Sequence, residues 1–258
     1  NGMTLPSRSR LGTPGCPATD AAGNSSEYGA VFVLPTTISG TVYHDVNGNA
    51  NVGDDGGAVF AGATVRLYAD NGAVGTIEAG DGWVATAITD ASGNYSFNVG
   101  NGNYWVAVDS TTLNSGAAYN AGYDATWIWA EQTYGDDSTT GGAVDLGARY
   151  GGRSATTSDA QIAGDATGSE HVARVNVAGG ASVAGVNYGF SFNPVVNTTD
   201  DPAGVPGNRT VQGSLRQFLI NANAIANASY GVQSAQFEIG AVGSAQTVAP
   251  TAALPTIT

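Results

Sequence analysis

The sequence of 258 residues predicts an all-β protein with a β-sandwich as its main body. Apolar residues recur at every second position in several short runs, which are Val65 to Leu67, Val84 to Ile88, Tyr95 to Val99 and Tyr104 to Val108. This period places one face of a strand against a core and leaves the other face in solvent. Turn sequences rich in Gly, Asn and Asp separate the runs at close to hairpin spacing. Together these features favour antiparallel strands in two packed layers.

Charge and composition exclude several classes of partner. All eight basic residues are arginines, against 21 carboxylates, and the net charge is -13. Such a surface repels phosphate backbones and anionic headgroups, so we expect no nucleic-acid partner. No apolar run approaches the roughly 20 residues of a membrane span, and we expect no membrane insertion. The low share of charged residues and the 38 glycines are typical of secreted β-rich proteins, which predicts an extracellular or cell-surface location.

Residues 1–36 are predicted to form an extended arm. Four prolines punctuate this segment, and its one strand-like run is AVFVL, Ala30 to Leu34. Proline interrupts regular pairing, so the segment does not read as a domain. Its single cysteine, Cys16, has no partner for an internal disulfide because the chain contains no other.

Residues 37–192 are predicted to form the sandwich, with a long insertion at about 111–170. An aromatic patch, TWIWAEQTY, opens the insertion, and a region rich in Gly, Ser, Thr and Asp follows it. Neither part alternates, so few strands are expected there. Alternation returns at Val172–Val177 and in VNYGFSF, Val186 to Phe192, which is the expected closing strand of the sandwich.

Residues 193–258 change in character and hold the one convincing helix. Its apolar stripe recurs at helical spacing, and Ser214 with Gln217 three positions later forms a capping box at its start. The stripe consists of Leu215, Phe218, Leu219, Ala222 and Ile225. Beyond Gly231, the short strand candidates are AQFEI at 235–239, AQTVA at 245–249 and LPTIT at 254–258.

The stretches SGTVYHDVNGNANVGDDGG and TDASGNYSF, with the run GNYWVAV, resemble the B-type repeat of serine-aspartate-rich and collagen-binding bacterial surface adhesins. The likeness covers Ile38 to Val108 closely and includes VNYGFSF as the last strand. It implies a prealbumin-like or Ig-like β-sandwich on a bacterial cell surface. Many domains of that family are locked by a bond from lysine to asparagine. This chain has no lysine, so any assembly must rest on strand pairing, burial or metal.

A second likeness concerns residues 211–258. The stretches QGSLRQFLINANAI and ALPTIT are similar to the cap and first coil of secreted right-handed parallel β-helix proteins. In that family many coils follow, whereas the sequence given ends at Thr258. A first coil alone leaves an open sheet edge over residues 235–258. Either further coils follow in a longer chain, or something else covers this edge.

The stretch DVNGNANVGDDGG is a candidate calcium loop. Asp45 and the next three asparagines at every second position occupy positions 1, 3, 5 and 7 of an EF-hand-like loop, where oxygens turn toward one hard cation. Position 6 is Ala50 instead of the usual Gly, and position 12 is Gly56, so an aspartate elsewhere must close the site. The candidate ligands are Asp45, Asn47, Asn49, Asn51, Asp54, Asp55 and Asp90.

The resemblance to adhesin repeats, which bind calcium at the corresponding loop, implies a real site. Since most of the ligands are neutral, we expect a modest affinity, in the extracellular class of about millimolar. The alternative is an Asx-rich turn whose side chains bond their own backbone.

No catalytic residue is predicted. The only histidines, His44 and His171, lie in no hydrolase or metalloprotease motif, so the chain is not expected to be an enzyme. One carbohydrate-directed alternative stays open, because Trp127 and Trp129 have the ring area to stack on a sugar. The acids beside them are Glu131, Asp136 and Asp137. The opposing interpretation is that both tryptophans pack the insertion onto the sandwich.

Five N-x-S/T sequons make glycans a further possible partner. They lie at Asn24, Asn94, Asn197, Asn208 and Asn227. A chain rich in Asn, Ser and Thr contains several such triplets by chance, so the signal for a glycoprotein is small.

The sequence therefore predicts a non-enzymatic extracellular structural protein that assembles with copies of itself. In this hypothesis the arm of one copy acts as a donor strand on the open edge at residues 235–258 of the next, and a head-to-tail filament or fibril results. The alternatives are a stalk or adhesin module of a larger cell-surface β-helix protein, and a secreted carbohydrate-binding or carbohydrate-active protein.

Overall fold

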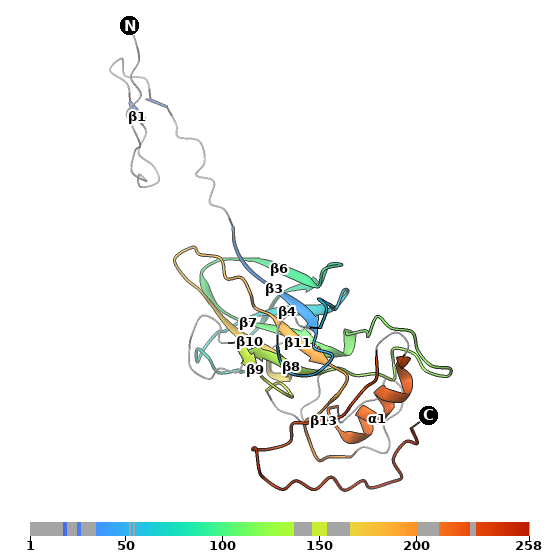
Figure 1. Ribbon diagram of the computed structural model, residues 1–258. Helices are drawn as coiled ribbons and strands as arrows, with labels where there is room; N and C mark the ends of the chain where they lie inside the picture. Colours follow the sequence, from blue (N-terminus) through green and yellow to red (C-terminus); the bar gives the residue numbers. More distant parts are fainter. Residues whose placement is uncertain are drawn as a thin grey trace. The chain divides into compact units, whose positions relative to one another are not determined.

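The computed structural model is mostly β, with two main sheets of five and four strands and one short helix (Figure 1). The two sheets share one core, so the architecture is β-sandwich-like, as the sequence predicts. The structure describes residues 18–19, 25–26, 35–51, 53, 55–136, 146–153, 166–200, 212–227 and 231–257.

The chain divides into two compact units, residues 1–35 and residues 36–258. In the first unit, β1 (Ala18–Thr19) pairs antiparallel with β2 (Ser25–Ser26). The run Ala30–Leu34 lies outside the described residues, so its role as a strand stays a prediction.

The five-stranded sheet has the order β6-β3-β11-β8-β9. Its pairs are antiparallel except for β3 with β11, which run parallel. The closing strand expected within Val186–Phe192 is confirmed, since β11 lies between β3 and β8 in the middle of the sheet. The bounds are β3 Thr36–His44, β6 Asn94–Val99, β8 Glu131–Asp136, β9 Leu146–Ala148 and β11 Tyr188–Ser191.

The four-stranded sheet is antiparallel throughout and has the order β10-β7-β4-β5. Every one of its strands falls on a run that the two-residue period predicted. One edge is β5, which pairs with β4 on one side only among the described strands. The bounds are β4 Thr64–Ala69, β5 Trp83–Ile88, β7 Gly102–Asp109 and β10 Val172–Val177.

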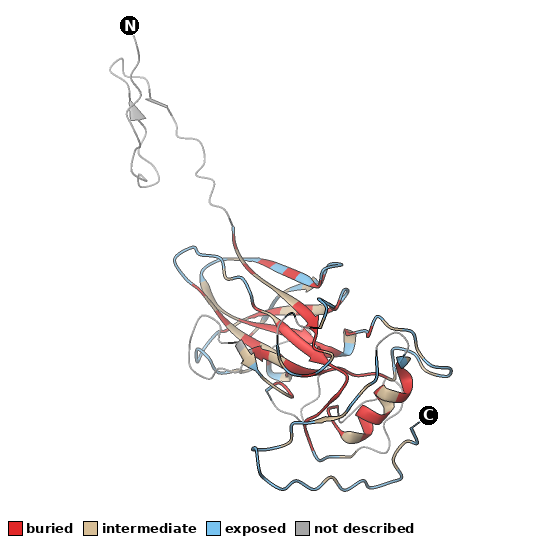
Figure 2. Cartoon of the chain, in the orientation of Figure 1, coloured by how far each residue is buried: buried red, intermediate tan, exposed pale blue. Residues whose placement is uncertain are grey.

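The core lies between the two sheets. Val65 and Leu67 of β4 and Val106 of β7 are fully buried, and they belong to the same apolar cluster as Ile38 of β3 and Phe190 of β11. Burial of side chains of this size stabilises the fold by about 1.5–3 kcal/mol each. In Figure 2 the buried residues run along both sheets, whereas the chain after β13 is mostly exposed.

The segment predicted as an insertion supplies strands to the main sheet. Within 111–170, β8 pairs antiparallel with β11 and β9 pairs with β8, and the short 3-10 helices Ser110–Thr112 and Ala166–Gly168 flank them. Few strands were expected, and few are described. Their membership of the central sheet was not predicted, because the buried residues Glu131, Gln132 and Thr133 are polar and show no apolar alternation.

The predicted helix is α1 (Leu215–Ala224). Ser214 caps it, since its side chain accepts a hydrogen bond from the Gln217 N–H. No hydrogen bond from the Ser214 N–H to Gln217 Oε1 is found among the described residues, so only this half of the capping box is formed. The Gln217 Nε2 donates to the Trp127 carbonyl and to Asn221 Oδ1. Phe218 and Leu219 of the apolar stripe are buried and pack with Val195.

The predicted first coil is only partly formed. β12 (Pro194–Val195) pairs parallel with β13 (Gln236–Phe237), so AQFEI contributes two strand residues. The candidates at 245–249 and 254–257 form no strand in the described structure, and most of their residues are exposed. Their composition suits a strand, but no neighbouring strand pairs with them, so the described residues show no β-helix.

A buried amide joins α1 to the sandwich. Asn221 Oδ1 accepts the Trp129 N–H at 3.0 Å, and its Nδ2 donates to the carbonyls of Trp129 at 2.9 Å and Phe192 at 3.0 Å. The Asn221 side chain thus forms the backbone hydrogen bonds that a neighbouring strand would otherwise form with Trp129 and Phe192. Residues on both sides of position 193 consequently pack in one unit. Among the described residues, no helix is long and apolar enough to cross a membrane.

Candidate functional site

The candidate calcium loop begins at Asp45, directly after β3. Asp45 is fully buried, and its carboxylate accepts the N–H groups of Asn49 at 3.0 Å and of Ala50 at 2.7 Å. Two further Asx contacts continue this winding. Asn47 Oδ1 accepts the Asn49 N–H at 2.9 Å, and Asn49 Oδ1 accepts the Asn51 N–H at 2.9 Å. The loop is therefore wound around the buried carboxylate.

Ala50 takes the conformation that glycine has in an EF-hand-like loop. Its φ of 58° is the one positive value of a non-glycine residue in the described chain. The sharp turn at position 6 normally needs glycine, because a Cβ in the left-handed region costs about 1–2 kcal/mol. The departure seen in the sequence is thus accommodated, and the Asp45 hydrogen bond to the Ala50 N–H offsets part of that cost.

The oxygens of this loop are of the kind that calcium prefers. The N–H donors use one lone pair on each of the bonded Asp45 and Asn47 oxygens, and each oxygen has two. Asp55 belongs to the same loop, since its carboxylate accepts the Asn47 N–H at 3.4 Å. The donor chemistry therefore fits a hard cation.

The other candidate ligands are not all brought together. Asp90 is held in the turn between β5 and β6, where its carboxylate accepts the N–H groups of Ser92 and Asn94. Asp54 lies outside the described residues. Among those that are described, no group of three or more His, Cys, Asp or Glu side chains is placed to hold a metal ion. The described part of the site thus rests on two carboxylates and on amide oxygens.

Three distant elements anchor the same loop. Tyr150 donates to the Gly48 carbonyl at 2.7 Å, and Asn193 Nδ2 donates to the Val46 carbonyl at 2.6 Å. Gln236 of β13 lies so close to Gly48 that a Cβ there would sit 2.2 Å from Gln236 Oε1. Burial, with the Glu238 and Asp45 carboxylates, raises the pKa of Tyr150 to about 12 and keeps its hydroxyl a donor. Nothing in the sequence singles out these anchors.

The aromatic patch is packed, not open. Trp129 is 6% exposed and its indole N–H donates to Ser110 Oγ at 2.8 Å. Trp127 is half-buried against the core and meets the Tyr123 ring edge-on at 5.3 Å. These contacts match the interpretation that the tryptophans pack their segment onto the sandwich. Of the acids beside them, Glu131 is buried, whereas Asp137 and the Asp136 side chain lie outside the described residues.

Both histidines are buried. His44 stacks on Phe60 with ring centroids 3.6 Å apart, and burial lowers its pKa to about 4. His171 Nδ1 lies 3.1 Å from Gln132 Oε1 and meets Phe190 edge-on. Each ring therefore has a structural partner.

The sequons differ in accessibility. Asn94 is exposed on edge strand β6, and Asn227 is exposed just beyond α1. Asn197 is buried, and its amide nitrogen donates to the Gln212 carbonyl at 2.8 Å, so a glycan there conflicts with the folded structure. Asn24 and Asn208 lie outside the described residues.

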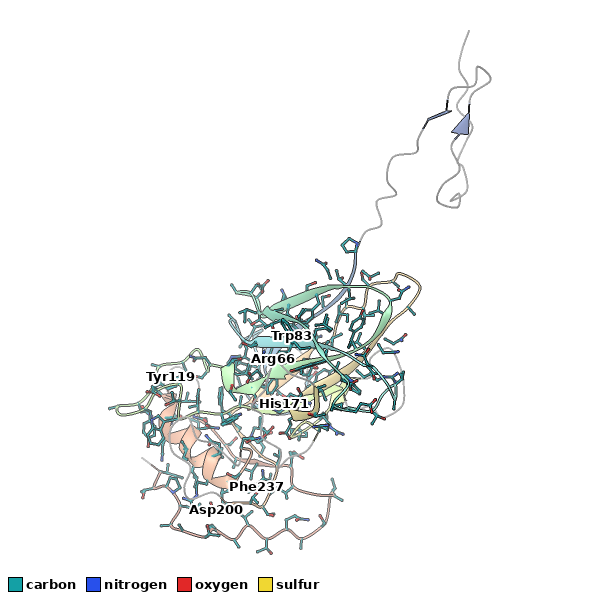
Figure 3. The ribbon with its side chains drawn as sticks, turned by 180° about the vertical axis from the view of Figure 1, so that it is seen from behind. Arg66, Trp83, Tyr119, His171, Asp200 and Phe237 are labelled. Carbon is teal, nitrogen blue, oxygen red and sulfur yellow. The ribbon has the colours of Figure 1, made fainter. Side chains whose placement is uncertain are left out.

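A groove of about 550 Å³ runs beside edge strand β5. Its lining includes Ala87 and Ile88 at the end of β5, Asp90 of the following turn, Asn94 and Ser96 of β6, and Thr41 of β3. Sequence reasoning missed this groove, although the apolar residues of β5 were noted. Figure 3 shows Trp83 of β5 on the part of the sandwich far from α1, whereas Asp200 and Phe237 lie near the helix.

No protein-family model matches the chain, and no curated protein matches it.

Proposed function

We propose that this chain is a non-enzymatic extracellular structural protein that assembles with copies of itself, head to tail, into a filament. The contact is strand addition, in which the apolar arm segment Ala30–Leu34 of one copy pairs with an open edge of the next. A head-to-tail contact that does not close on itself propagates without limit.

Exposed apolar side chains at open strand edges carry the proposal. Trp83 and Ile88 on β5 are 47% and 59% exposed, and Phe237 on β13 is 57% exposed. An edge strand with unpaired N–H and C=O groups and apolar side chains is a template for another strand. Protected edges normally carry charge or proline, and neither occurs in β5 or β13.

Charge favours the arm as the donor. Residues 1–35 carry two arginines and two carboxylates, so the net charge of -13 belongs to residues 36–258. Two bodies of that charge repel each other, and the repulsion weakens as salt screens it. A neutral apolar segment approaches such a body without that penalty.

Calcium is part of the proposed function as a stabiliser of the sandwich. Asp45, Asn47 and Asn49, with Asp55, would supply the oxygens, and the bound cation would lock the loop that Tyr150 and Gln236 already anchor. A cation that binds only the folded loop stabilises it by mass action.

A stalk module of a larger surface protein is the second candidate. Apolar side chains on the C-terminal segment favour it, since Val232, Val242 and Ile257 are exposed there. In this proposal the unit β12-α1-β13, with its parallel strands, is the first turn of a β-helix that stacks on a prealbumin-like sandwich. Further coils would then cover these side chains.

Electron microscopy and sedimentation of the full chain test the proposal. Filaments and a high mass are expected for the natural chain, and Val31→Glu with Val33→Glu should abolish them, because buried strand pairing does not tolerate two charges. Ala21→Glu with Ala22→Glu is the matched control, which adds the same charge outside the apolar run and should still assemble. A natural chain that stays monomeric at every salt and calcium concentration would exclude self-assembly and favour the stalk.

A further inference from the structure

Among the edges of the two main sheets, β5 is the unprotected one. β6 turns Asn94, Ser96 and Asn98 outward, and β9 has three residues. β10 turns Arg174 and Asn176 outward. The sequence of β5, WVATAI, has six residues with no charge and no proline. Natural sheets protect their edges with charge, proline or short strands, and β5 has none of these.

The geometry of β5 suits an added strand. Its register with β4 shifts once, at Val84, and then runs regularly from Ala85 to Ile88. Its outer side pairs with no strand of the described chain. The groove of about 550 Å³ lies at the Ile88 end of this side, where apolar Ala87 and Ile88, uncharged Thr41 and Ser96, and the acidic Asp90 line it.

The edge at residues 235–258, which the sequence indicated as the acceptor, fits less well. β13 has two strand residues, whereas β5 has six, and pairing strength grows with the number of ladder hydrogen bonds.

We propose that β5 and its groove are the acceptor for the apolar segment Ala30–Leu34 of a second copy, an inference that rests on the proposed self-assembly. The segment has five uncharged residues, which suits the six residues of β5. It falls within residues 1–35, which form a separate unit from residues 36–258. On pairing, it extends the four-stranded sheet by one strand, and its apolar side chains cover Ile88.

Disulfide trapping in the full chain tests the contact directly. All variants carry Cys16→Ser. One copy carries Phe32→Cys, and the other, with a different affinity tag, carries Ile88→Cys. A disulfide needs Cα atoms within about 7 Å, so a cross-link reports close approach. The matched control replaces Ile88→Cys by Val74→Cys, which is similarly exposed at 56% on the same sheet's long loop. Cross-linking to Ile88→Cys should exceed cross-linking to the control by at least about tenfold.

A second variant measures the energetic role of the edge. Val84→Lys with Ile88→Lys should raise the concentration needed for assembly by at least about tenfold, because edge lysines block strand addition. Val74→Lys should leave that concentration unchanged. All three positions are exposed, so the melting temperature should hardly change and any loss of assembly reports the contact.

The outcomes separate the two proposals. If the natural chain assembles while Ile88→Cys cross-links no better than the control, the acceptor is not β5, although self-assembly stands. A cross-link that forms within single chains carrying both cysteines makes the chain's own arm the occupant and overturns the inference. If the natural chain does not assemble and no cross-link forms, the proposed self-assembly is itself excluded.

Discussion

The sandwich and the C-terminal segment at residues 231–257 are held in opposite ways. Two facing sheets bury one continuous apolar core. The C-terminal segment is mostly exposed. Its residues Ala235, Ile239 and Leu254 pack against the small cluster around Phe218, and directed hydrogen bonds fix the segment further. The difference teaches that apolar burial made the sandwich predictable, whereas the attachment of the segment depends on individual polar side chains.

One arginine of α1 provides much of that attachment. The Arg216 guanidinium bonds both oxygens of Asp200 and donates to the carbonyls of Ala252 at 3.0 Å and Ala253 at 2.8 Å. Asp200 in turn accepts the Thr251 N–H at 2.7 Å. The guanidinium holds the pKa of Asp200 well below its usual range. We define Arg216, Asp200 and residues 251–253 as the C-terminal clamp.

The largest expected effect is on the core. Phe190→Ala should lower the free energy of unfolding by about 3–5 kcal/mol, because it empties a fully buried site between the sheets. Urea denaturation followed by tryptophan fluorescence measures it. Val242→Ala, at a fully exposed position of the C-terminal segment, is the control and should change stability by less than about 0.5 kcal/mol. Equal effects at the two positions would contradict the comparison.

Asn221 joins α1, the helix that carries Arg216 of the clamp, to the sandwich, and its loss should cost nearly as much. Asn221→Ala leaves the buried Trp129 N–H and C=O without this partner, so a loss of about 2–4 kcal/mol is expected in urea denaturation. Asn223→Ala, which removes one bond to the Thr256 carbonyl, should cost about 1 kcal/mol. If the two variants cost the same, Asn221 does not connect the helix to the sheet as described.

Acid should weaken the sandwich before it releases the clamp. The pKa of His44 is about 4 in the fold and about 6.5 when unfolded, so between these values the unfolded state binds more protons. Stability should therefore fall as pH drops from about 6.5 to 4, by up to about 3 kcal/mol. His44→Phe should flatten this dependence in urea titrations at a series of pH values. An unchanged slope would mean that another group dominates.

The clamp has a different pH window. The pKa of Asp200 is lower in the folded state than in the unfolded state. The stabilisation from the Asp200 carboxylate is therefore fully present above its unfolded pKa of about 3.9, and it is lost only as the pH falls through its lower folded pKa. Exchange of the Thr251 amide, relative to its intrinsic rate, should thus stay protected at pH 4.

Calcium is expected to act on the sandwich with a smaller effect. If the Kd is about millimolar, calcium at about ten times that Kd should add about 1.4 kcal/mol to the free energy of unfolding. Calorimetry with and without chelator measures it. Asp55→Asn should reduce the shift, while Asp90→Asn should keep it, because Asp90 is held in a different turn. An unchanged melting curve in calcium would leave the loop as an Asx-rich turn.

The smallest global effect is expected at the clamp. Arg216→Ala should speed hydrogen exchange at Thr251 by at least about tenfold while exchange in β4 and β7 stays unchanged, because the segment opens locally. Arg216→Lys is the matched variant, which keeps the charge but loses the bidentate geometry and should also speed exchange. Slowed or unchanged exchange at Thr251 in both would show that the clamp does not hold the segment.

Local patterns in the sequence determined the parts of this protein that bury one apolar face. The two-residue period located the four strands of one sheet and β6 and β11 of the other, and the Ser214 cap with its stripe located α1. The Asx spacing located a loop wound around Asp45. Each of these features depends on neighbours within a few positions, so it can be predicted from the sequence alone.

Tertiary structure decided what depends on partners far along the chain. β8 pairs on both sides within the five-stranded sheet although Glu131, Gln132 and Thr133 are polar, because neighbouring segments bury and bond them. The segments 245–249 and 254–257 beyond β13 have a sequence typical of strands, but their described residues form none. A strand forms only where another strand supplies its hydrogen bonds. Likewise, the anchors of the Asp45 loop lie about a hundred or more positions away, and β5 became an open edge through sheet order alone. Pairing and burial over such separations are properties of the folded chain, which no local pattern encodes.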